Sequence, residues 1–213
     1  MVKRKQSVGW PKSLTPLFKQ YGGRKHPLNF KNAYQLLAVV ILSAQDSDKH
    51  INKVAPNFFK AYPSLKKLAK AKPVQLFPLI STVRNFGNKA KWLVSVANTL
   101  KDGRNIPKTL EGLTALPGIG RKSANVIMSE LGYEMEGVIV DLHVFRVAPR
   151  LGMAEGTNPS KIEKQLMEAV PQKHWRELGM GLSYLGREIC RPTNPKCPEC
   201  VMNVVCAYYK NQQ

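Results

Sequence analysis

Residues 116–126 read Leu-Pro-Gly-Ile-Gly-Arg-Lys-Ser-Ala-Asn-Val, and they decide how the rest of the chain is interpreted. The flanks have a helical apolar pattern, so Pro117 should end one helix and the two glycines should form a tight hairpin into the next. The second helix then begins with unpaired backbone N–H groups, which can bind an anion such as a DNA phosphate. A contact made through backbone N–H groups would not depend on the base sequence of the DNA. A lone Gly-x-Gly is usually an ordinary turn, but these flanks and the basic pair favour a helix-hairpin-helix motif at about 109–131. The residues expected to contact DNA here are Gly118, Gly120 and Arg121.

Outside the hairpin, apolar residues recur at spacings of three and four without sustained alternation of period two, which predicts an all-α protein. Long helices are expected over 33–43, 47–62, 88–102, 121–131 and 175–190. Asn32 is suited to cap the first of them. Pro56 should kink or break the second, and Gly103 should end the third. Asp141 should open a further helix that Pro149 ends.

The chain has 213 residues, enough for one large or two small domains with a real core. Hydrophobic residues make up 43% and charged residues 22%, as in ordinary soluble proteins. The balance of charge is unusual, because 33 Lys and Arg face only 14 Asp and Glu, which gives a net charge of +19. So basic a surface implies a polyanionic partner, either nucleic acid or an anionic membrane.

The membrane alternative has little support in the sequence. The longest apolar run, residues 36–42, is far shorter than the roughly 20 residues of a membrane-spanning helix. The basic residues 3–5 are followed by Trp10-Pro11-Lys12 instead of the apolar core of a secretion signal. We therefore expect a cytoplasmic, nucleoid-associated monomer that binds double-stranded DNA and no membrane.

All the cysteines lie near the C-terminus with the spacing C-x6-C-x2-C-x5-C: Cys190, Cys197, Cys200 and Cys206. An iron–sulfur cluster suits four thiols in an irregular loop. A structural zinc usually pairs two C-x2-C knuckles, of which one is present, and two disulfides suit a small secreted domain. The spacing alone favours the cluster, then zinc, then disulfides. The loop 191–196 carries Arg191 and Lys196, which either contact a phosphate backbone or stay in solvent.

Together these stretches resemble the endonuclease III family of DNA glycosylases. The resemblance rests on residues 116–126, Val-Asp-Leu-His-Val-Phe-Arg-Val at 140–147, Leu-Ser-Ala-Gln at 42–45 and the four-cysteine tail. It implies two domains: a six-helix barrel at 27–135 that carries the hairpin, and a cluster domain made of 1–26 and 136–213. It also implies that the four cysteines, in the loop 190–206, hold a [4Fe–4S] cluster.

The resemblance also assigns the catalytic residues. From the residues alone, Lys122 at a helix start is more often a phosphate contact, and Asp141 before a helix is more often an N-cap. The resemblance implies that Lys122 is the nucleophile and Asp141 the catalytic aspartate, a role compatible with capping. Because the two lie on either side of the domain boundary, we expect a cleft between the domains. The implied activity is bifunctional: removal of oxidised pyrimidines from duplex DNA, then cleavage on the 3′ side by β-elimination.

Further residues are expected at the DNA interface. Gln45 matches a family glutamine that fills the space left by a flipped base, and is otherwise a polar residue at a helix end. His143 and Arg146, about one helical turn apart, are placed to reach phosphates. The family usually has glycine, a bulky apolar residue and an aromatic where this chain has Arg84-Asn85-Phe86. The apolar residue wedges into the duplex, so Asn85 calls the wedge, and with it the lesion preference, into question.

Two alternatives remain open. A related glycosylase with another base choice, adenine or mismatched thymine, would share most of these motifs. A non-catalytic DNA-binding module with a structural metal would share the basic charge and the cysteines, but it would have no need of Lys122 and Asp141.

Overall fold

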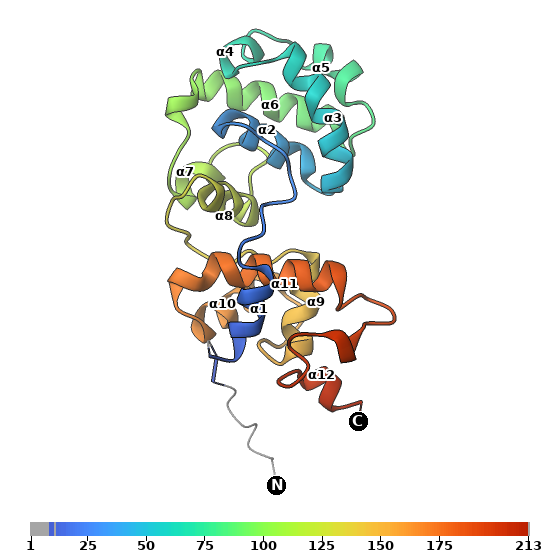
Figure 1. Cartoon of the computed structure of the whole chain (residues 1–213). Coiled ribbons are helices and arrows are strands. Elements are labelled where there is room, and N and C mark those ends of the chain that lie inside the picture. Colours follow the sequence, from blue (N-terminus) through green and yellow to red (C-terminus); the bar gives the residue numbers. More distant parts are fainter. Residues whose placement is uncertain (1–8, 11, 213) are drawn as a thin grey trace. The chain divides into compact units, whose positions relative to one another are not determined.

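The computed structural model describes residues 9–10 and 12–212, and within them every regular element is a helix (Figure 1). The expectation of an all-α protein is therefore confirmed. The chain divides into two compact units: one is the continuous segment His26–Glu134, and the other combines the residues up to Lys25 with Met135–Gln213. Residues 1–8, with the basic residues 3–5, lie outside the described residues. Among the described helices, none combines the length and apolar character needed to cross a bilayer.

The unit of residues 26–134 is built around α2 (Ala33–Ser43). Eight of its eleven residues are buried, because the helix is apolar on most sides and packs against three others. Asn32 caps it as predicted, accepting a 2.9 Å hydrogen bond from the Gln35 N–H. The other helices of this unit are α3 (Asp48–Ala61), α4 (Leu65–Leu68), α5 (Pro73–Ile80), α6 (Phe86–Leu100), α7 (Leu110–Thr114) and α8 (Arg121–Glu130).

Two prolines lie inside helices that the sequence predicts them to interrupt. Pro56 lies within α3, which continues to Ala61 with Phe58 fully buried. Pro149 lies within α9 (Leu142–Leu151), which ends before Gly152, a glycine with φ of 85°. The expected helix end at Pro149 is therefore wrong, and Pro56 does not end its helix either. In both cases the buried apolar side chains beyond the proline outweigh the backbone hydrogen bond that proline removes.

The end of α6 also differs from the expectation, because the helix stops at Leu100 instead of at Gly103. Lys101 has a positive φ of 58°, which a glycine adopts more easily. The Asn105 side chain donates a 2.8 Å hydrogen bond to the Leu100 carbonyl. A side-chain cap at the helix end thus replaces the expected glycine stop.

In the other unit, α11 (Trp175–Glu188) packs against both α1 (Thr15–Tyr21) and α9. A Cβ at Gly181 would lie 3.0 Å from Leu17 Cγ, and one at Gly186 would lie 2.8 Å from His143 Cβ. These glycines, which the sequence suggests would loosen α11, instead let its neighbours approach closely. The remaining helices of this unit are α10 (Pro159–Ala169) and α12 (Ala207–Lys210), with 3-10 turns at Lys12–Leu14, Gln172–His174 and Cys197–Glu199.

Candidate active site and metal centre

The hairpin between α7 and α8 uses its two glycines differently. Gly118 has φ of 82°, and a Cβ there would lie 2.7 Å from Trp92 Cε3, so the turn lies against the indole ring and admits no side chain. Gly120 has φ of −92° and open space at its Cβ position, and it is the N-cap residue of α8. The Ile119 N–H closes the turn by donating to the Leu116 carbonyl at 3.2 Å. The first glycine makes the turn, and the second leaves the helix start uncovered.

The start of α8 combines several features of an anion site. No side chain caps the helix at Gly120, and Arg121 and Lys122 begin its first turn with exposed side chains. The helix dipole adds partial positive charge at this end. Backbone N–H groups, a guanidinium and an amine are therefore presented at one exposed helix start.

Asp141 is held through both of its carboxylate oxygens. Oδ1 accepts hydrogen bonds from the His143 and Val144 N–H groups at 2.9 and 2.8 Å, which confirms the predicted N-cap of α9. Oδ2 accepts a 2.6 Å hydrogen bond from the Ser183 hydroxyl on α11 and lies 3.9 Å from Nη2 of Arg187. These partners fix the carboxylate, so Asp141 offers a negative charge of defined orientation in its own unit.

Arg146, which the sequence predicts to reach a phosphate, bonds to groups of its own unit. Its Nε donates to the Cys190 carbonyl at 3.0 Å, and its Nη2 donates to the Gly186 carbonyl at 2.9 Å. Nη2 also lies 3.3 Å from Nδ1 of His143. Arg146 therefore ties α9 to the end of α11 and to the first cysteine. This geometry favours a structural role over the phosphate contact that the sequence suggests.

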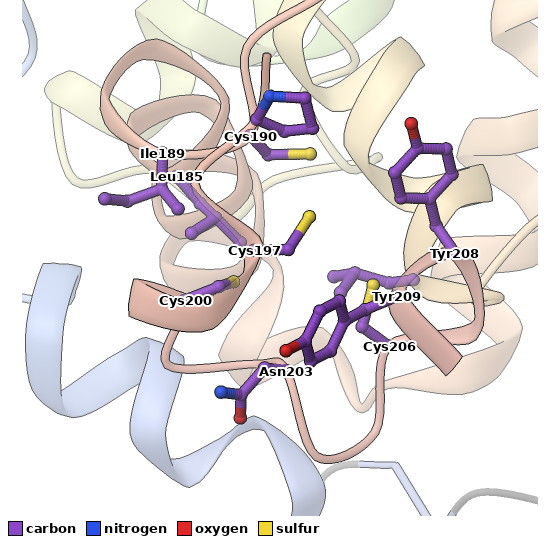
Figure 2. Close-up of a pocket in the computed structure, with 11 residues that line it drawn as sticks. Leu185, Ile189, Cys190, Cys197, Cys200, Asn203, Cys206, Tyr208 and Tyr209 are labelled. Atoms are coloured by element: carbon purple, nitrogen blue, oxygen red, sulfur yellow. The ribbon is translucent and has the colours of Figure 1, made fainter. Parts of the chain in front are cut away.

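The four cysteines line one pocket, and none of them forms a disulfide. Figure 2 shows the sulfurs of Cys190, Cys197 and Cys206 pointing toward the same space. The disulfide alternative is therefore not supported. The pocket is completed mainly by apolar and aromatic side chains, which include Leu151, Leu185, Ile189, Tyr208 and Tyr209.

The donor set of this pocket consists of four thiols, which suit either an iron–sulfur cluster or a zinc ion. Burial, with a further contribution from the other three thiols, raises the pKa of Cys200 to about 11, and burial also raises the pKa of Cys197. A bound cationic centre would reverse this effect, because metal-coordinated cysteines are deprotonated. Zinc binds thiolate sulfurs at about 2.3 Å from one ion, whereas a cluster spreads four thiolates over several irons.

Arg150 of α9 holds the loop that follows the first cysteine. Its Nη1 donates to that cysteine's Sγ at 3.5 Å and to the Arg191 carbonyl at 2.7 Å, and its Nη2 donates to the Pro192 carbonyl at 3.1 Å. The guanidinium also lies 4.7 Å from the ring centroid of Tyr208. Sequence reasoning missed Arg150, although its position one helical turn after Arg146 indicates a shared helix face.

The two basic residues expected to contact DNA from this loop, Arg191 and Lys196, are both exposed. Lys196 Nζ lies 3.3 Å from Oε2 of Glu199, in an exposed pair of the kind that contributes little to stability. The loop therefore presents both cations at the surface of its unit.

Gln45 and Asn85 share an unusual backbone conformation. Both have φ in the left-handed region, 59° and 57°, and both side chains are exposed. Gln45 follows the C-cap residue of α2, and Asn85 is the N-cap residue of α6. Because residues other than glycine rarely adopt this conformation, the surroundings must hold it. The contacts that do so involve Asp46, His50 and Lys89, which sequence reasoning missed.

The sequence of this chain was compared with protein families and with known proteins. Residues 38–172 match the model of the HhH-GPD superfamily of base excision DNA repair proteins. The chain is 36% identical over 209 residues to endonuclease III of Synechocystis sp., an alignment that covers 97% of this chain and 94% of that protein. It is 33% identical to endonuclease III of Thermotoga maritima, with 89% and 90% of the two chains covered.

Solved structures give the same result for the fold. The chain matches a trapped endonuclease III–DNA covalent intermediate and a non-covalent endonuclease III–DNA complex, each with a TM-score of 0.85 and 30% identity. In each case 94% of this chain and 95% of the other are covered. A thermostable thymine-DNA glycosylase, at 23% identity and a TM-score of 0.76, shares the fold.

Proposed function

Because the chain belongs to the endonuclease III family, within the HhH-GPD superfamily of base excision DNA repair proteins, we propose that it is a bifunctional DNA glycosylase and AP lyase. Its substrate is duplex DNA that contains an oxidised pyrimidine or an abasic site. It removes the damaged base and then cuts the strand on the 3′ side by β-elimination.

The observation that carries this proposal is the exposed amine of Lys122 in the first turn of α8, directly after the glycine hairpin. A DNA-binding module needs cations at this place but gains nothing from an amine that can attack carbon. A 30% identical structure is described as a trapped covalent intermediate with DNA, which requires a nucleophile on the protein. Lys122 is the nucleophile that supplies this chemistry here.

The reaction begins with flipping of the damaged nucleotide, because its glycosidic bond cannot be reached inside the base stack. The Lys122 Nζ forms a bond to the sugar C1′ while the bond from C1′ to the base breaks, and the departing base takes up a proton. The sugar ring opens to a Schiff base with Lys122. Loss of a proton from C2′ then expels the 3′ phosphate, which is the β-elimination step.

Asp141 contributes the negative charge of this reaction. Its carboxylate stabilises the positive charge that develops on the sugar as the base leaves, and it assists deprotonation of the Lys122 amine. The hydrogen bonds from two N–H groups and from Ser183 orient the carboxylate before substrate arrives, so little reorganisation is needed.

The cluster proposed here is a [4Fe–4S] centre held by Cys190, Cys197, Cys200 and Cys206. When bound, it supplies cross-links that order the loop 190–206 and leaves the excision steps to the protein. Arg150 orients the first part of this loop through its bonds to the carbonyls of Arg191 and Pro192. Arg191 and Lys196 then reach the phosphate backbone from a fixed loop.

The DNA contacts of the other unit come from two places. In the hairpin, Gly120 and Arg121 bind a phosphate. In the loops next to α2 and α6, Gln45 and Asn85 enter the duplex where the base is flipped. The net charge of +19 supports a sequence-independent affinity for the duplex. We infer that the protein works as a monomer on DNA in the cytoplasm.

Borohydride trapping tests the proposal, because borohydride reduces a Schiff base between protein and sugar to a permanent link. Wild-type protein should become cross-linked to duplexes that contain thymine glycol or an abasic site. Lys122→Ala should lose the cross-link and still bind DNA. Lys66→Ala, which removes an exposed lysine on α4 away from the hairpin, is the matched control and should keep it. Equal trapping by wild type and Lys122→Ala would identify another amine as the nucleophile.

Base choice is tested with a panel of duplexes that each carry one lesion. Excision of thymine glycol in preference to adenine opposite 8-oxoguanine and to thymine opposite guanine is the expected result. The reverse preference would place the chain among glycosylases of different substrate class with the same fold.

A further inference from the structure

Asp46 connects the loop after α2 with the loop before α6. Its Oδ2 accepts a hydrogen bond from the backbone N–H of Arg84 at 3.0 Å, across 38 positions of sequence. Its Oδ1 accepts from the next N–H along the chain at 2.7 Å and lies 2.8 Å from Nδ1 of His50. The Asp46 side chain is 11% exposed, so its carboxylate is largely covered, while Arg84 and Thr82 lie at the surface. Gln45 precedes Asp46 and Asn85 follows Arg84, so the junction is adjacent to both left-handed residues.

His50 and Lys89 strengthen the same connection. His50 Nε2 lies 3.1 Å from Oγ1 of Thr82, so the imidazole bridges α3 and the loop before α6. Lys89 is buried, and its Nζ donates to the Leu42 and Ala44 carbonyls at 2.7 and 2.6 Å. The ammonium thereby caps the C-terminal carbonyls of α2 from the first turns of α6.

These bonds hold the backbone on both sides of each left-handed residue. Lys89 fixes the peptide group before Gln45 through the Ala44 carbonyl, and Asp46 itself follows Gln45. Asp46 fixes the N–H of the residue before Asn85, and the Asn85 carbonyl accepts a hydrogen bond from the Lys89 N–H at 3.1 Å. The Lys89 and Asp46 side chains therefore hold the backbone beside Gln45, and Asp46 holds the backbone before Asn85. The Asn85 amide is further oriented by Asn88, whose Nδ2 donates to its Oδ1 at 2.9 Å.

The chemistry of this junction exceeds what two helix ends require. Glycine adopts the left-handed conformation without strain, so a fold that needed only turns here would place glycine at positions 45 and 85. Burying Lys89 and most of Asp46 opposes folding unless their charges find partners. The chain instead keeps amide side chains at positions 45 and 85, and it covers the charged groups of Lys89 and Asp46 next to them. That combination is typical of a surface held ready for a ligand.

We propose that Asp46, supported by His50 and Lys89, is a positioning residue that couples Gln45 to Asn85, so that the two amides enter the duplex as one pair when a base is flipped. The inference rests on the proposed function. Because an amide both donates and accepts hydrogen bonds, Asn85 pairs with the edge of the orphaned base on the opposite strand while Gln45 fills the gap. Asp46 acts through these two residues and does not touch DNA.

The test uses a duplex in which 2-aminopurine stands opposite a tetrahydrofuran abasic analogue, because 2-aminopurine brightens when it leaves the base stack. Wild-type protein should raise the emission, and Asp46→Ala should lose most of that rise. Asp46→Ala should also slow excision of thymine glycol roughly 10-fold to 100-fold through misplacement of the pair. Cleavage of a preformed abasic site, which needs no base displacement, should change less than about threefold. Asp46→Asn keeps an acceptor for the Arg84 N–H and should recover part of the excision rate.

The matched control is Asp102→Ala. Asp102 lies beyond the other end of α6, and its Oδ1 likewise accepts from a backbone N–H, that of Arg104, at 2.9 Å. This variant should match wild type in both the emission and the ratio of the two rates. An unchanged emission rise and an unchanged rate ratio in Asp46→Ala would overturn the inference.

The fold of Asp46→Ala is checked by circular dichroism. If this variant does not fold, Asp46→Asn and His50→Ala are measured in its place. A wild-type rise in emission in both of them would overturn the inference. The emission depends on binding and insertion and not on excision. Wild-type protein that raises the emission without cutting any lesion would therefore refute the proposed activity and leave the coupling to be judged by the Asp46 variants.

Discussion

The Ser183 hydroxyl donates a 2.6 Å hydrogen bond to Oδ2 of Asp141, while Oδ1 of the same carboxylate caps α9. The two oxygens therefore serve different purposes, one fixed by the backbone and one by a side chain from another helix. Because the cap and the charge depend on different features of the side chain, substitution can separate them.

Asp141→Asn should fold as well as wild type and lose most of its activity. Asparagine caps helices as well as aspartate does, but it carries no charge to stabilise the developing sugar cation. We expect a fall of roughly 100-fold or more in single-turnover excision, with an unchanged melting temperature by circular dichroism. Ser183→Ala should lower the excision rate about tenfold, because it loses a hydrogen bond to the charged Asp141 carboxylate. Ser160→Ala, at an exposed position, is the control and should keep the wild-type rate. An intact rate in Asp141→Asn would reduce Asp141 to a helix cap.

Gly120→Asp should weaken DNA binding without weakening the fold. Aspartate is a good N-cap and the Cβ position is open, so α8 gains a cap while a carboxylate occupies the expected phosphate position. Gly120→Asn is the matched neutral control. The dissociation constant for undamaged duplex, measured by fluorescence anisotropy at several salt concentrations, should rise for the aspartate variant alone. Equal affinity in the two variants would show that phosphate does not bind at this helix start.

The cysteine pocket should hold about four irons per chain, which elemental analysis and a yellow-brown colour will show. One zinc and no iron would contradict the cluster. The protein stripped of metal should lose stability as the pH rises from about 9 to about 11. Burial raises the pKa of the folded Cys200 thiol to about 11 from an ordinary 9.0, so the folded state resists deprotonation that the unfolded state accepts. Protein with the cluster intact, whose thiolates are already ionised, should lack this loss in thermal melts over the same range.

Arg150→Ala should loosen the loop that begins at Cys190. The variant loses hydrogen bonds to the Arg191 and Pro192 carbonyls and one to the Cys190 sulfur. We expect the visible absorbance of the cluster to bleach several-fold faster in ferricyanide, since the sulfur becomes more accessible. Arg191→Ala, an exposed position in the same loop, should keep the wild-type bleaching rate and reduce DNA affinity. Identical bleaching of Arg150→Ala and wild type would remove Arg150 from the support of this site.

The parts of the structure that the sequence predicts are those set by neighbouring residues. The caps at Asn32 and Asp141 follow from a polar side chain placed directly before an apolar helical pattern, and both are confirmed. The family and the all-α fold are confirmed as well, because several local motifs occur in a fixed order. The expected helix ends at Pro149 and Gly103 are wrong. Burial of apolar side chains beyond Pro149 extends α9, and the Asn105 side chain caps α6 at Leu100.

The parts that the sequence does not predict depend on contacts between distant positions. The bond from the Arg84 N–H to Asp46 spans 38 residues, and no pattern in either segment indicates it. Arg146 has the position of a phosphate contact in the sequence, yet its guanidinium is directed at the Cys190 and Gly186 carbonyls. Only the packing of α9 against α11 brings these groups together.

The indole ring of Trp92 against Gly118 gives the protein a natural fluorophore next to the turn that we propose binds the DNA backbone. The other two tryptophans, Trp10 and Trp175, belong to the other unit. Replacing those two by phenylalanine would leave one emitter, whose spectrum should change if the hairpin binds DNA as proposed. Association can then be followed in stopped flow without a dye on either partner, and separated in time from the slower steps of bond cleavage.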